Sequence, residues 1–413
     1  MATTIEQLQT EHNTTIPLIV EQDKRLPLVT MQLTFTASGT ITDGKKAGLA
    51  KLCAKMMNEG TKKLGASAFA LELESRAIHI SSSVGVETFV LELSTLKEEF
   101  PFALKKIKEL LVDPNLTQES LAKVKTMTLG SLSRKENDFD YVASNELKAI
   151  LFEGTPLANP SLGTPKSVES ITLDDVKNFL AKHLVASRLI VSVGGDVEPQ
   201  QLKKDIVSLA DVLAQGESEK LPFYKVRKEP KEVLLKRETQ QAYIYFGAPF
   251  ALKESDADAY KAKVAAFVLG AGGFGSRLME EIRVKRGLAY SAYARVNLAK
   301  SRSYFSGYLQ TKTDSLSEAQ KEVKAVIAEF LDKGITQEEL EQTKRFLLGS
   351  EPLRIETMSQ RVQRSFMEYY TGKEQGASHK ELEKIEALTL DEINSFIKQH
   401  KEILELSFAI VTK

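Results

Sequence analysis

The sequence is poor in the residues on which disulfide-stabilised folds and histidine-based metal sites depend. Its 413 residues include one cysteine, five histidines and no tryptophan. Cys53 alone excludes an intramolecular disulfide, leaves the redox compartment open, and is most simply a core residue. No two of the histidines lie three to five residues apart; they are His12, His79, His183, His379 and His400. The sequence therefore contains no zinc motif built on two neighbouring histidines.

An excess of charge of one sign is also missing. Lysine plus arginine and aspartate plus glutamate both number 56. This balance disfavours nucleic acid and anionic membranes as partners. No run reaches about 18 apolar residues, so we expect no membrane span. The N-terminus, MATTIEQLQTEHN, is polar and unlike a signal peptide. The compartment stays unknown: cytoplasmic as the sequence stands, or periplasmic if a signal peptide has been removed.

An internal repeat is present. LTQESLAKVKTMTLGS (116–131) matches ITQEELEQTKRFLLGS (335–350) without a gap at an offset of 219 residues, with eight of the sixteen positions identical. TLDDVKNFLAKH (172–183) matches TLDEINSFIKQH (389–400) at an offset of 217. Two windows with nearly the same offset indicate a duplicated chain, because this period is far longer than that of a solenoid repeat. His183 and His400 occupy equivalent positions, which favours a structural role for both.

Each copy mixes strands and amphipathic helices, which predicts an α+β fold. Strands are expected at 16–21, 26–37, 77–86, 88–94, 187–193, 242–250, 302–311 and 406–412. Residues 217–233 are charged, contain Pro222 and Pro230, and lack periodicity, which is typical of a linker. We therefore predict two homologous domains, 1–216 and 234–413, each a mainly antiparallel sheet packed with helices. A duplicated chain of this kind usually binds its ligand between the halves.

The most informative stretch is VLGAGGFGSRLMEEIRVKRGLAYSA (268–292). An apolar helix reaches a glycine-rich turn (Gly270, Gly272, Gly273, Gly275), and a second helix starts at about Ser276, a good N-cap type. Gly287 is expected to stop this helix, and a strand follows. The turn is not a phosphate loop, because no Gly-Lys-Ser/Thr follows it. Arg283 on the helix and Tyr290 on the strand could therefore point into one pocket.

This stretch resembles the second-half motif of the insulinase/pitrilysin family of zinc peptidases, in particular its smaller members of the mitochondrial-processing-peptidase type. The family motif is a glycine-rich turn, Ser-Arg-Leu, and then Arg and Tyr separated by six residues. Here the tripeptide is 276–278 and the pair is Arg283 and Tyr290. The resemblance implies that this pair binds the substrate carbonyl beside zinc. It also implies that the turn binds substrate through Gly272, Gly273, Phe274, Gly275 and Ser276.

The resemblance covers nearly the whole chain, but the zinc residues are replaced. GLAKLCAKMMNEGT (48–61) resembles the family's active helix, Gly-Leu-Ala-His-x-x-Glu-His. Lys51 and Lys55 stand at the two histidine positions, and Ala54 stands at the position of the general base. The third ligand is expected near 130–132, where the sequence reads Gly-Ser-Leu. A protonated lysine repels a metal cation and alanine activates no water, so we expect no catalytic zinc in this chain.

Simpler interpretations exist for each of these residues. Lys51 and Lys55 lie opposite the apolar face of their helix, so a solvated helix surface explains them fully. Alone, Arg283 would be a charge at a helix end and Tyr290 a half-buried strand aromatic. The complete motif inside a duplicated fold favours the functional interpretation of the pair.

In two-chain members of the family, one subunit carries the zinc helix and the other carries the Arg/Tyr pair. The resemblance therefore implies the zinc-less subunit of a heterodimeric metallopeptidase, with its two domains forming half of a peptidase chamber. The expected partners are a homologous zinc-bearing subunit and peptide substrates, with a homodimer when the chain is alone. No cofactor is expected in this chain, and zinc is expected in the partner.

Two other functional hypotheses remain open. The chain could be an inactive structural or peptide-binding protein on the peptidase fold, as the family's respiratory-complex core subunits are. A zinc-independent enzyme is a third reading, but no Ser/His/Asp or Cys/His constellation supports it. Retention of both Arg283 and Tyr290 favours the peptidase subunit.

Overall fold

The computed structural model describes residues 3–413. They form two compact units, each built on one sheet and both discontinuous in sequence. Of the described residues, unit 1 contains those up to 133, 160–221 and 354–369, and unit 2 contains 134–159, 222–353 and 370–413. The boundary at 221/222 falls inside the segment that the sequence marks as a linker. No helix in the described range is long and apolar enough to cross a membrane.

The sheet of unit 1 has six strands in the order β1-β2-β6-β3-β5-β4. Only β2 and β6 pair in parallel, and the other neighbouring strands are antiparallel. The bounds of the strands are β1 (Thr3–Gln9), β2 (Thr15–Gln22), β3 (Leu28–Thr36), β4 (His79–Val84), β5 (Thr88–Leu96) and β6 (Leu189–Gly195). The sequence analysis missed β1, because its pattern TTIEQLQ is polar and lacks clear alternation.

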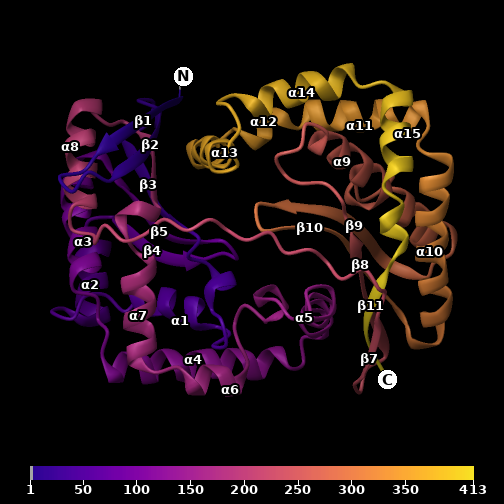
Figure 1. Cartoon of the computed structure of the whole chain (residues 1–413), viewed down its shortest axis with the longest axis horizontal. Coiled ribbons are helices and arrows are strands. Elements are labelled where there is room, and N and C mark those ends of the chain that lie inside the picture. The colour runs from indigo at the N-terminus through magenta and orange to yellow at the C-terminus, as the bar shows by residue number, and fades with distance from the viewer. Residues whose placement is uncertain (1–2) are drawn as a thin grey trace. The chain divides into compact units, whose positions relative to one another are not determined.

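The helices of unit 1 bury one face of this sheet in a single hydrophobic core (Figure 1). The bounds of the helices are α1 (Leu49–Met57), α2 (Gly65–Glu74), α3 (Phe100–Val112), α4 (Gln118–Lys135), α6 (Pro165–Ser170), α7 (Leu173–His183) and α8 (Pro199–Ala210). Cys53 lies in this core, as the sequence indicates. Thr164 and Thr172 begin α6 and α7 with capping boxes, which satisfy backbone N–H groups that would otherwise lack partners.

The sheet of unit 2 has five strands in the order β7-β11-β8-β10-β9. This order repeats β2-β6-β3-β5-β4 of unit 1, with the same single parallel pair. The bounds of the strands are β7 (Glu232–Lys236), β8 (Gln241–Pro249), β9 (Ala289–Ala299), β10 (Arg302–Lys312) and β11 (Ser407–Thr412). The α+β class, the mainly antiparallel sheets and the internal duplication are therefore confirmed.

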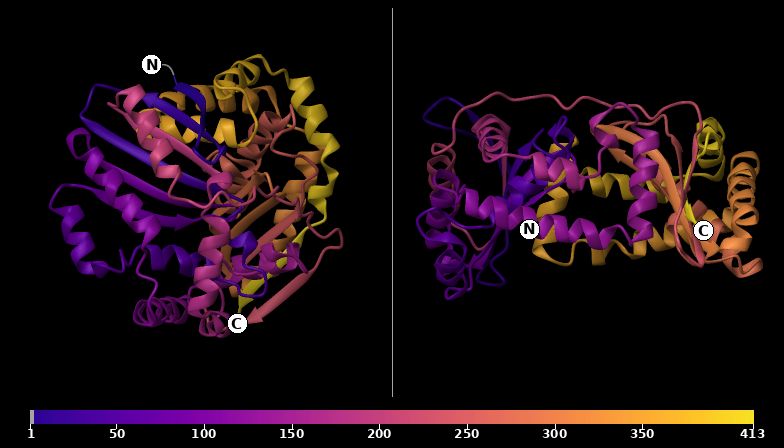
Figure 2. Two further views of the ribbon diagram at one scale, coloured as in Figure 1. Left: turned by 60° about the vertical axis from the view of Figure 1, so that its left-hand side comes forward. Right: turned by 90° about the horizontal axis from the view of Figure 1, so that it is seen from below.

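Helices also cover the core face of the second sheet, where α10 (orange) and α15 (yellow) lie side by side (Figure 1 and Figure 2). The bounds of the remaining helices are α5 (Phe139–Leu151), α9 (Ala259–Ala266), α10 (Leu316–Lys333), α11 (Gln337–Gly349), α12 (Glu351–Arg354), α13 (Met358–Tyr370), α14 (Ala377–Ala387) and α15 (Leu390–Gln399). Two π-helical turns, Phe267–Ala271 and Met279–Lys285, flank the glycine-rich turn.

Each half of the sequence gives one helix to the unit built mainly from the other half. Helix α5 packs on β8 and β11 of unit 2, and α13 belongs to unit 1. The two helices are equivalents in the duplication, because Phe139 and Met358 are separated by the same 219 residues as the longer repeat. This reciprocal exchange explains why β6 and β11 are buried along their whole length: helices cover both faces.

Candidate functional site

Helix α1 holds the three residues at the predicted zinc and base positions. Gly48, with φ +92°, precedes the helix, and the Asp43 carboxylate accepts the backbone N–H groups of Gly48 and Ala50, each at 2.8 Å. At the other end, the Asn58 side chain donates to the Ser82 carbonyl oxygen (3.2 Å) and accepts its N–H (2.7 Å), which ties the helix to β4. Both ends of α1 are thus fixed by polar contacts.

The structure corrects the interpretation of Lys51 and Lys55 as a solvated surface. Both side chains are half-buried. The Lys51 ammonium donates to the carbonyl oxygen of Val84 at the end of β4, and the Lys55 ammonium donates to Oγ1 of Thr128 on α4 at 2.8 Å. Burial lowers the pKa of both lysines, and the charge of Lys51 lowers that of Lys55 further. The two ammonium groups therefore share one polar site.

These residues do not fit a zinc ion. Two ammonium groups and the methyl group of Ala54 supply no lone pair for a metal. Within residues 3–413, no group of three His, Cys, Asp or Glu residues is placed to hold a metal ion. The α4 residue that contacts Lys55 is Thr128, two residues before the interval expected for the third ligand, and sequence reasoning missed it.

The glycine-rich turn is fixed by close packing and by unusual backbone angles. A Cβ on Gly270 would lie 2.5 Å from the backbone nitrogen of Ala294, so glycine lets this segment approach β9. Gly273 and Gly275 have φ of +66° and +91°, where a side chain would be strained. A Cβ on Gly272 would lie 2.8 Å from the Phe267 carbonyl oxygen. The glycines thus shape the turn and leave Phe274 at its tip.

Ser276 and Arg277 hold the turn in place. The Ser276 side chain is only 2% exposed, and its hydroxyl donates to the Gly273 carbonyl oxygen at 2.7 Å. Arg277 binds Glu339 of α11 through two contacts of 2.7 and 2.8 Å and donates to the Gly334 carbonyl oxygen at 2.7 Å. Because their polar groups are engaged within the protein, the direct contribution of both residues is to the shape of the turn.

The helix after the turn begins and ends where the sequence predicts. Helical residues begin at Arg277, directly after Ser276. Gly287 has φ +63°, its N–H donates to the Arg283 carbonyl oxygen at 3.0 Å, and the N–H of Leu288 donates to Ile282 at 2.9 Å. The bond from Gly287 is that of the αL C-cap motif, in which the first residue past the helix end is left-handed. The helix stop at Gly287 is therefore confirmed.

A β-bulge presents Tyr290 to solvent. Ala292 pairs with Leu309 and Ala289 with Thr311, so Tyr290 and Ser291 on β9 stand opposite Gln310 alone. Bulges of this kind redirect a side chain and are frequent beside functional sites. Tyr290 is 81% exposed, whereas Ala289 and Ala292 are buried. A strict alternation would not have produced this orientation, and the sequence carries no signal for the bulge.

The structure brings Arg283, Tyr290 and Phe274 together. The guanidinium carbon of Arg283 lies 4.6 Å from the Phe274 ring centroid and 4.5 Å from that of Tyr290. Phe274 is 72% exposed, so both rings extend from the protein surface with the half-buried arginine between them. No carboxylate in the described range lies within 4.0 Å of Arg283 as an ion-pair partner. The cation–π contacts orient the guanidinium, and its N–H donors stay available to a ligand.

A groove runs beside this trio, behind the turn. It has a volume of about 220 Å³ and is lined by Phe267, Val268, Gly272, Phe274, Gly275, Ser276, Glu339, Gln342, Thr343 and Phe346. The rings of Phe267 and Phe346 are in tilted contact, with their centroids 4.8 Å apart. Of the three glycines predicted to bind substrate, Gly272 and Gly275 line this groove, and Gly273 lies at the turn itself.

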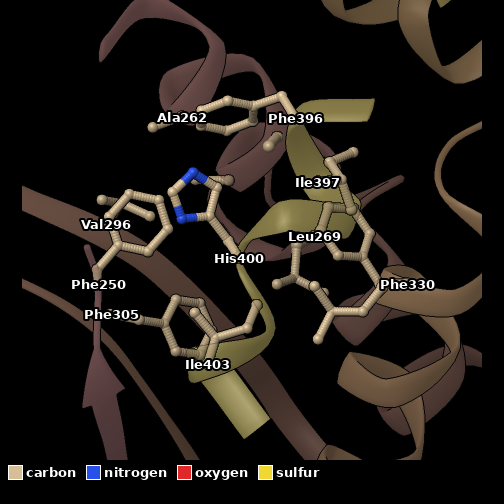
Figure 3. Close-up of a pocket in the computed structure, with 13 residues that line it drawn as sticks. Phe250, Ala262, Leu269, Val296, Phe305, Phe330, Phe396, Ile397, His400 and Ile403 are labelled. Atoms are coloured by element: carbon tan, nitrogen blue, oxygen red, sulfur yellow. The ribbon is translucent and has the colours of Figure 1, made fainter. Parts of the chain in front are cut away.

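A second cavity, around His400, belongs to the hydrophobic core (Figure 3). Figure 3 shows the imidazole among Phe250, Phe396 and aliphatic side chains. Its ring stacks on Phe250 at 4.5 Å, and its Nδ1 lies 2.8 Å from a Glu402 carboxylate oxygen. In unit 1 the equivalent His183 packs on Phe179 at 4.3 Å, and Nη1 of Arg188 lies 3.2 Å from its Nδ1. Both histidines have packing partners that suit a structural role.

Comparison with known proteins identifies relatives along the whole chain. Family models described as "Insulinase (Peptidase family M16)" and "Peptidase M16 inactive domain" match residues 18–165 and 170–347. The chain is 45% identical to the non-peptidase homologue YmxG of Helicobacter pylori over 397 residues, which is 96% of this chain and 92% of that protein.

Two solved structures share the fold. A crystal structure of a peptidase M16 inactive domain from Pseudomonas fluorescens has a TM-score of 0.91 at 24% identity, covering 99% of this chain and 98% of that one. The crystal structure of a protease from Helicobacter pylori has a TM-score of 0.84 at 16% identity and covers 100% of both chains. At these identities, the two structures support the fold alone.

Proposed function

This chain belongs to the insulinase family of peptidases, family M16, and on that premise we propose that it is the zinc-less subunit of a two-chain peptidase. The observation that carries the proposal is the half-buried Arg283 held between the exposed rings of Phe274 and Tyr290, in a chain with Lys51, Ala54 and Lys55 at the metal positions. A chain that keeps an oriented cation and an exposed phenol, but lacks metal ligands, suits complementation of a partner that has the ligands.

In this proposal Arg283 and Tyr290 bind the carbonyl oxygen of the scissile peptide bond. A zinc ion in the partner would supply the activated water. Arg283 and the Tyr290 hydroxyl donate hydrogen bonds to the oxygen as negative charge develops on it, which stabilises the transition state more than the ground state. Arg277, six residues earlier, illustrates the alternative: it is bound to Glu339 and Gly334 and has a structural role.

The sheet edge offers a way to bind an extended peptide. Strand β9 lies at the edge of the second sheet, and Tyr290 is on this strand. An extended peptide can pair with the backbone of an edge strand, which fixes its register with little dependence on its side chains. We propose that a substrate adds to β9 and thereby places a carbonyl group beside Arg283 and Tyr290.

Two Helicobacter pylori proteins are described in terms that suit the two chains of such a pair. Its relative of this chain is named a non-peptidase homologue, and another of its proteins, with the same fold, is described as a protease. The name of the relative also fits a second function, an inactive scaffold or peptide-binding protein. A scaffold would leave the exposed stack around Arg283 without a role, and the donors aimed from this stack suit a reacting carbonyl group, so we favour the peptidase subunit.

Reconstitution tests the proposal. This chain is mixed with a zinc-bearing M16 chain from the same organism, and peptide hydrolysis is measured with each variant. Tyr290→Phe keeps the ring over Arg283 and removes only the hydroxyl, so it is the cleaner probe. Arg283→Ala removes the cation. Loss of one oxyanion donor typically lowers kcat by about 10²- to 10³-fold, so we expect a loss of this order for each variant.

The matched control is Tyr293→Phe on the same strand, whose ring packs against Tyr308 at 5.9 Å. It should leave kcat nearly unchanged. If Tyr290→Phe and Arg283→Ala both stay within about twofold of the unmodified kcat, neither residue acts in the transition state and the scaffold function is preferred. A rise in KM alone would indicate ground-state binding only.

A further inference from the structure

Lys51 and Lys55 are two half-buried cations that lack an anionic partner in the described part of the chain. Each ammonium group has three N–H donors. The structure gives Lys51 one acceptor, the Val84 carbonyl oxygen, and gives Lys55 one acceptor, Oγ1 of Thr128. Neither lies within 4.0 Å of a carboxylate among residues 3–413. Both acceptors are neutral, so most of the charge and most of the donors at this site are not satisfied by the protein.

Lys106 shows how a buried lysine in this unit is otherwise accommodated. Its side chain is 7% exposed, and its ammonium group forms ion pairs with Glu72 and with Glu109, the latter at 2.8 Å. Lys46, also partly buried, pairs with Asp175. Burial of a charge is costly unless an opposite charge accompanies it. Lys51 and Lys55 on α1 are also partly buried, but neither forms an ion pair with a carboxylate in the described part of the chain.

The nearest acid does not neutralise the pair. Asp43 has both carboxylate oxygens bound to backbone N–H groups of Gly48 and Ala50. Burial raises the pKa of Asp43 to about 7, so a substantial fraction of this carboxyl group is uncharged at neutral pH. Its charge acts on Lys51 through space and does not form an ion pair with it. The net charge of the site remains positive.

We propose that Lys51 and Lys55 form an anion site that binds a carboxylate group. The two residues are one helical turn apart on the same face of α1, so one carboxylate can accept a hydrogen bond from each ammonium group through its two oxygens. The pair places two ammonium groups where the family motif has metal ligands, and Ala54 adds no negative charge between them. The site has changed from binding a metal to binding an anion directly.

A peptide is the carrier of the carboxylate that we infer, and this part of the inference rests on the proposed function. Lys51 is tied to the end of β4, which is the edge strand of the first sheet. The carboxylate could be the C-terminus of the peptide or an Asp or Glu side chain. The anion site itself depends on neither Arg283 nor Tyr290, so it can be tested on this chain without a zinc-bearing partner.

Binding of fluorescent peptides to the full chain tests the proposal by anisotropy. One peptide has an internal glutamate and a free C-terminus; two others have either the glutamate changed to glutamine or the C-terminus amidated, and a fourth has both changes. We expect the doubly changed peptide to bind at least about tenfold more weakly than the first, because it lacks a charge-assisted hydrogen bond. Whichever single change accounts for the loss identifies the source of the carboxylate. Binding should also weaken as salt concentration rises.

The protein variant is Lys51→Met/Lys55→Met, and its control is Lys62→Met/Lys63→Met, which removes the same charge from two exposed lysines. The first variant should lose the preference for a carboxylate, and the control should keep it. If the first variant discriminates among the four peptides as the unmodified chain does, the proposal is wrong. It is also wrong if the unmodified chain does not discriminate among them.

Thermal unfolding of the same variants distinguishes a binding site from a purely structural pair. Removal of two unpaired, half-buried charges should leave the melting temperature of the ligand-free chain unchanged or raise it. A fall in melting temperature with unaltered peptide binding would mean that the lysines only connect α1 to β4 and α4. The two proposals can fail separately. If the peptides bind as expected but Tyr290→Phe keeps full activity in the reconstituted complex, the anion site is retained and the proposed catalytic role is rejected.

Discussion

Two histidines at equivalent positions of the duplication have different chemical environments. His400 lies beside the Glu402 carboxylate, whereas His183 lies beside the Arg188 guanidinium. Burial, and then the charge of Arg188, lowers the pKa of His183 to about 4 from an ordinary value of 6.5. The aromatic contact one turn earlier, Phe179 or Phe396, is common to both. The duplication has therefore kept the packing and changed the electrostatics.

His183 should make the stability of the chain sensitive to acid. Below about pH 6.5 the unfolded chain binds a proton at this residue, whereas the native chain does so only near pH 4. The free energy of unfolding therefore falls as pH decreases through this window, by about 3 kcal/mol in total. His183→Gln removes the titration, so its stability should fall less steeply between about pH 7 and pH 4, as measured by urea unfolding.

The control is His379→Gln, because the His379 side chain is 80% exposed. Its stability should follow that of the unmodified chain across the whole range. Parallel curves for His183→Gln and the unmodified chain would show that His183 does not determine the acid sensitivity.

For single residues, the sequence predicts which ones belong to the candidate site better than it predicts their neighbours in the fold. The spacing of Arg283 and Tyr290 predicts that they meet, and their stacking agrees with this geometry. Periodicity within α1 places Lys51 and Lys55 on a polar face and predicts solvent there. Their actual neighbours, Val84 and Thr128, come from β4 and α4, and a helical pattern contains no information about residues so distant in sequence.

The exchanged helices α5 and α13 are the main feature at the level of elements. Arg361 attaches helix α13 to the first sheet through two ion pairs. Its guanidinium binds Glu21 at 3.1 Å and Asp23 at 2.6 Å, and the side chains of all three residues are at most 16% exposed. On the same helix, Val362 and Met358 lie against Gly194 of β6, where a Cβ would be 2.6 Å from Val362. The helix therefore combines an apolar contact with a buried ion pair.

Arg361→Ala should detach α13 from the sheet. It leaves two buried carboxylates without this partner, a change that typically costs about 3–5 kcal/mol. Arg25 still pairs with Asp23, which places the expected loss near the lower end of this range. Hydrogen exchange should show faster exchange in residues 354–370, and the free energy of unfolding should decrease.

Lys380→Ala is the matched comparison, because it breaks an ion pair with Glu374 in which the side chains are 62% and 80% exposed. An exposed pair contributes about 0–1 kcal/mol, so little change is expected. Equal effects of the two substitutions would contradict the role given to Arg361.

The elements themselves were largely predictable, and their assignment to units was not. Alternation and capping signals located most strands and helices, and the repeat predicted that both sheets share one topology. The polar strand β1 and the short β7, which begins within the predicted linker, were missed. The exchange of α5 and α13 was also missed, since an amphipathic pattern shows that a helix face is buried but not which sheet buries it.

For the whole molecule, membership of family M16 and the Lys51-Ala54-Lys55 substitutions are the basis on which we propose function in an assembly. A carbonyl-binding pair stabilises a transition state only where another group attacks the carbonyl, and within residues 3–413 no metal site supplies such a group. The chain alone is thus proposed to have half of a catalytic apparatus. In the proposed function, a chain that has kept the zinc ligands supplies the other half.

We therefore expect a complex with a zinc-bearing M16 chain, and a homodimer when this chain is alone. Light scattering coupled to gel filtration should show a heterodimer after mixing, and elemental analysis should find about one zinc per heterodimer but no stoichiometric zinc in this chain alone. Peptide hydrolysis should appear only in the mixture. A variant partner with its zinc motif removed should still form the complex but lack activity, because it can no longer hold the metal that activates the water. A strict monomer with and without the partner, or one tightly bound zinc in the isolated chain, would contradict the proposed subunit.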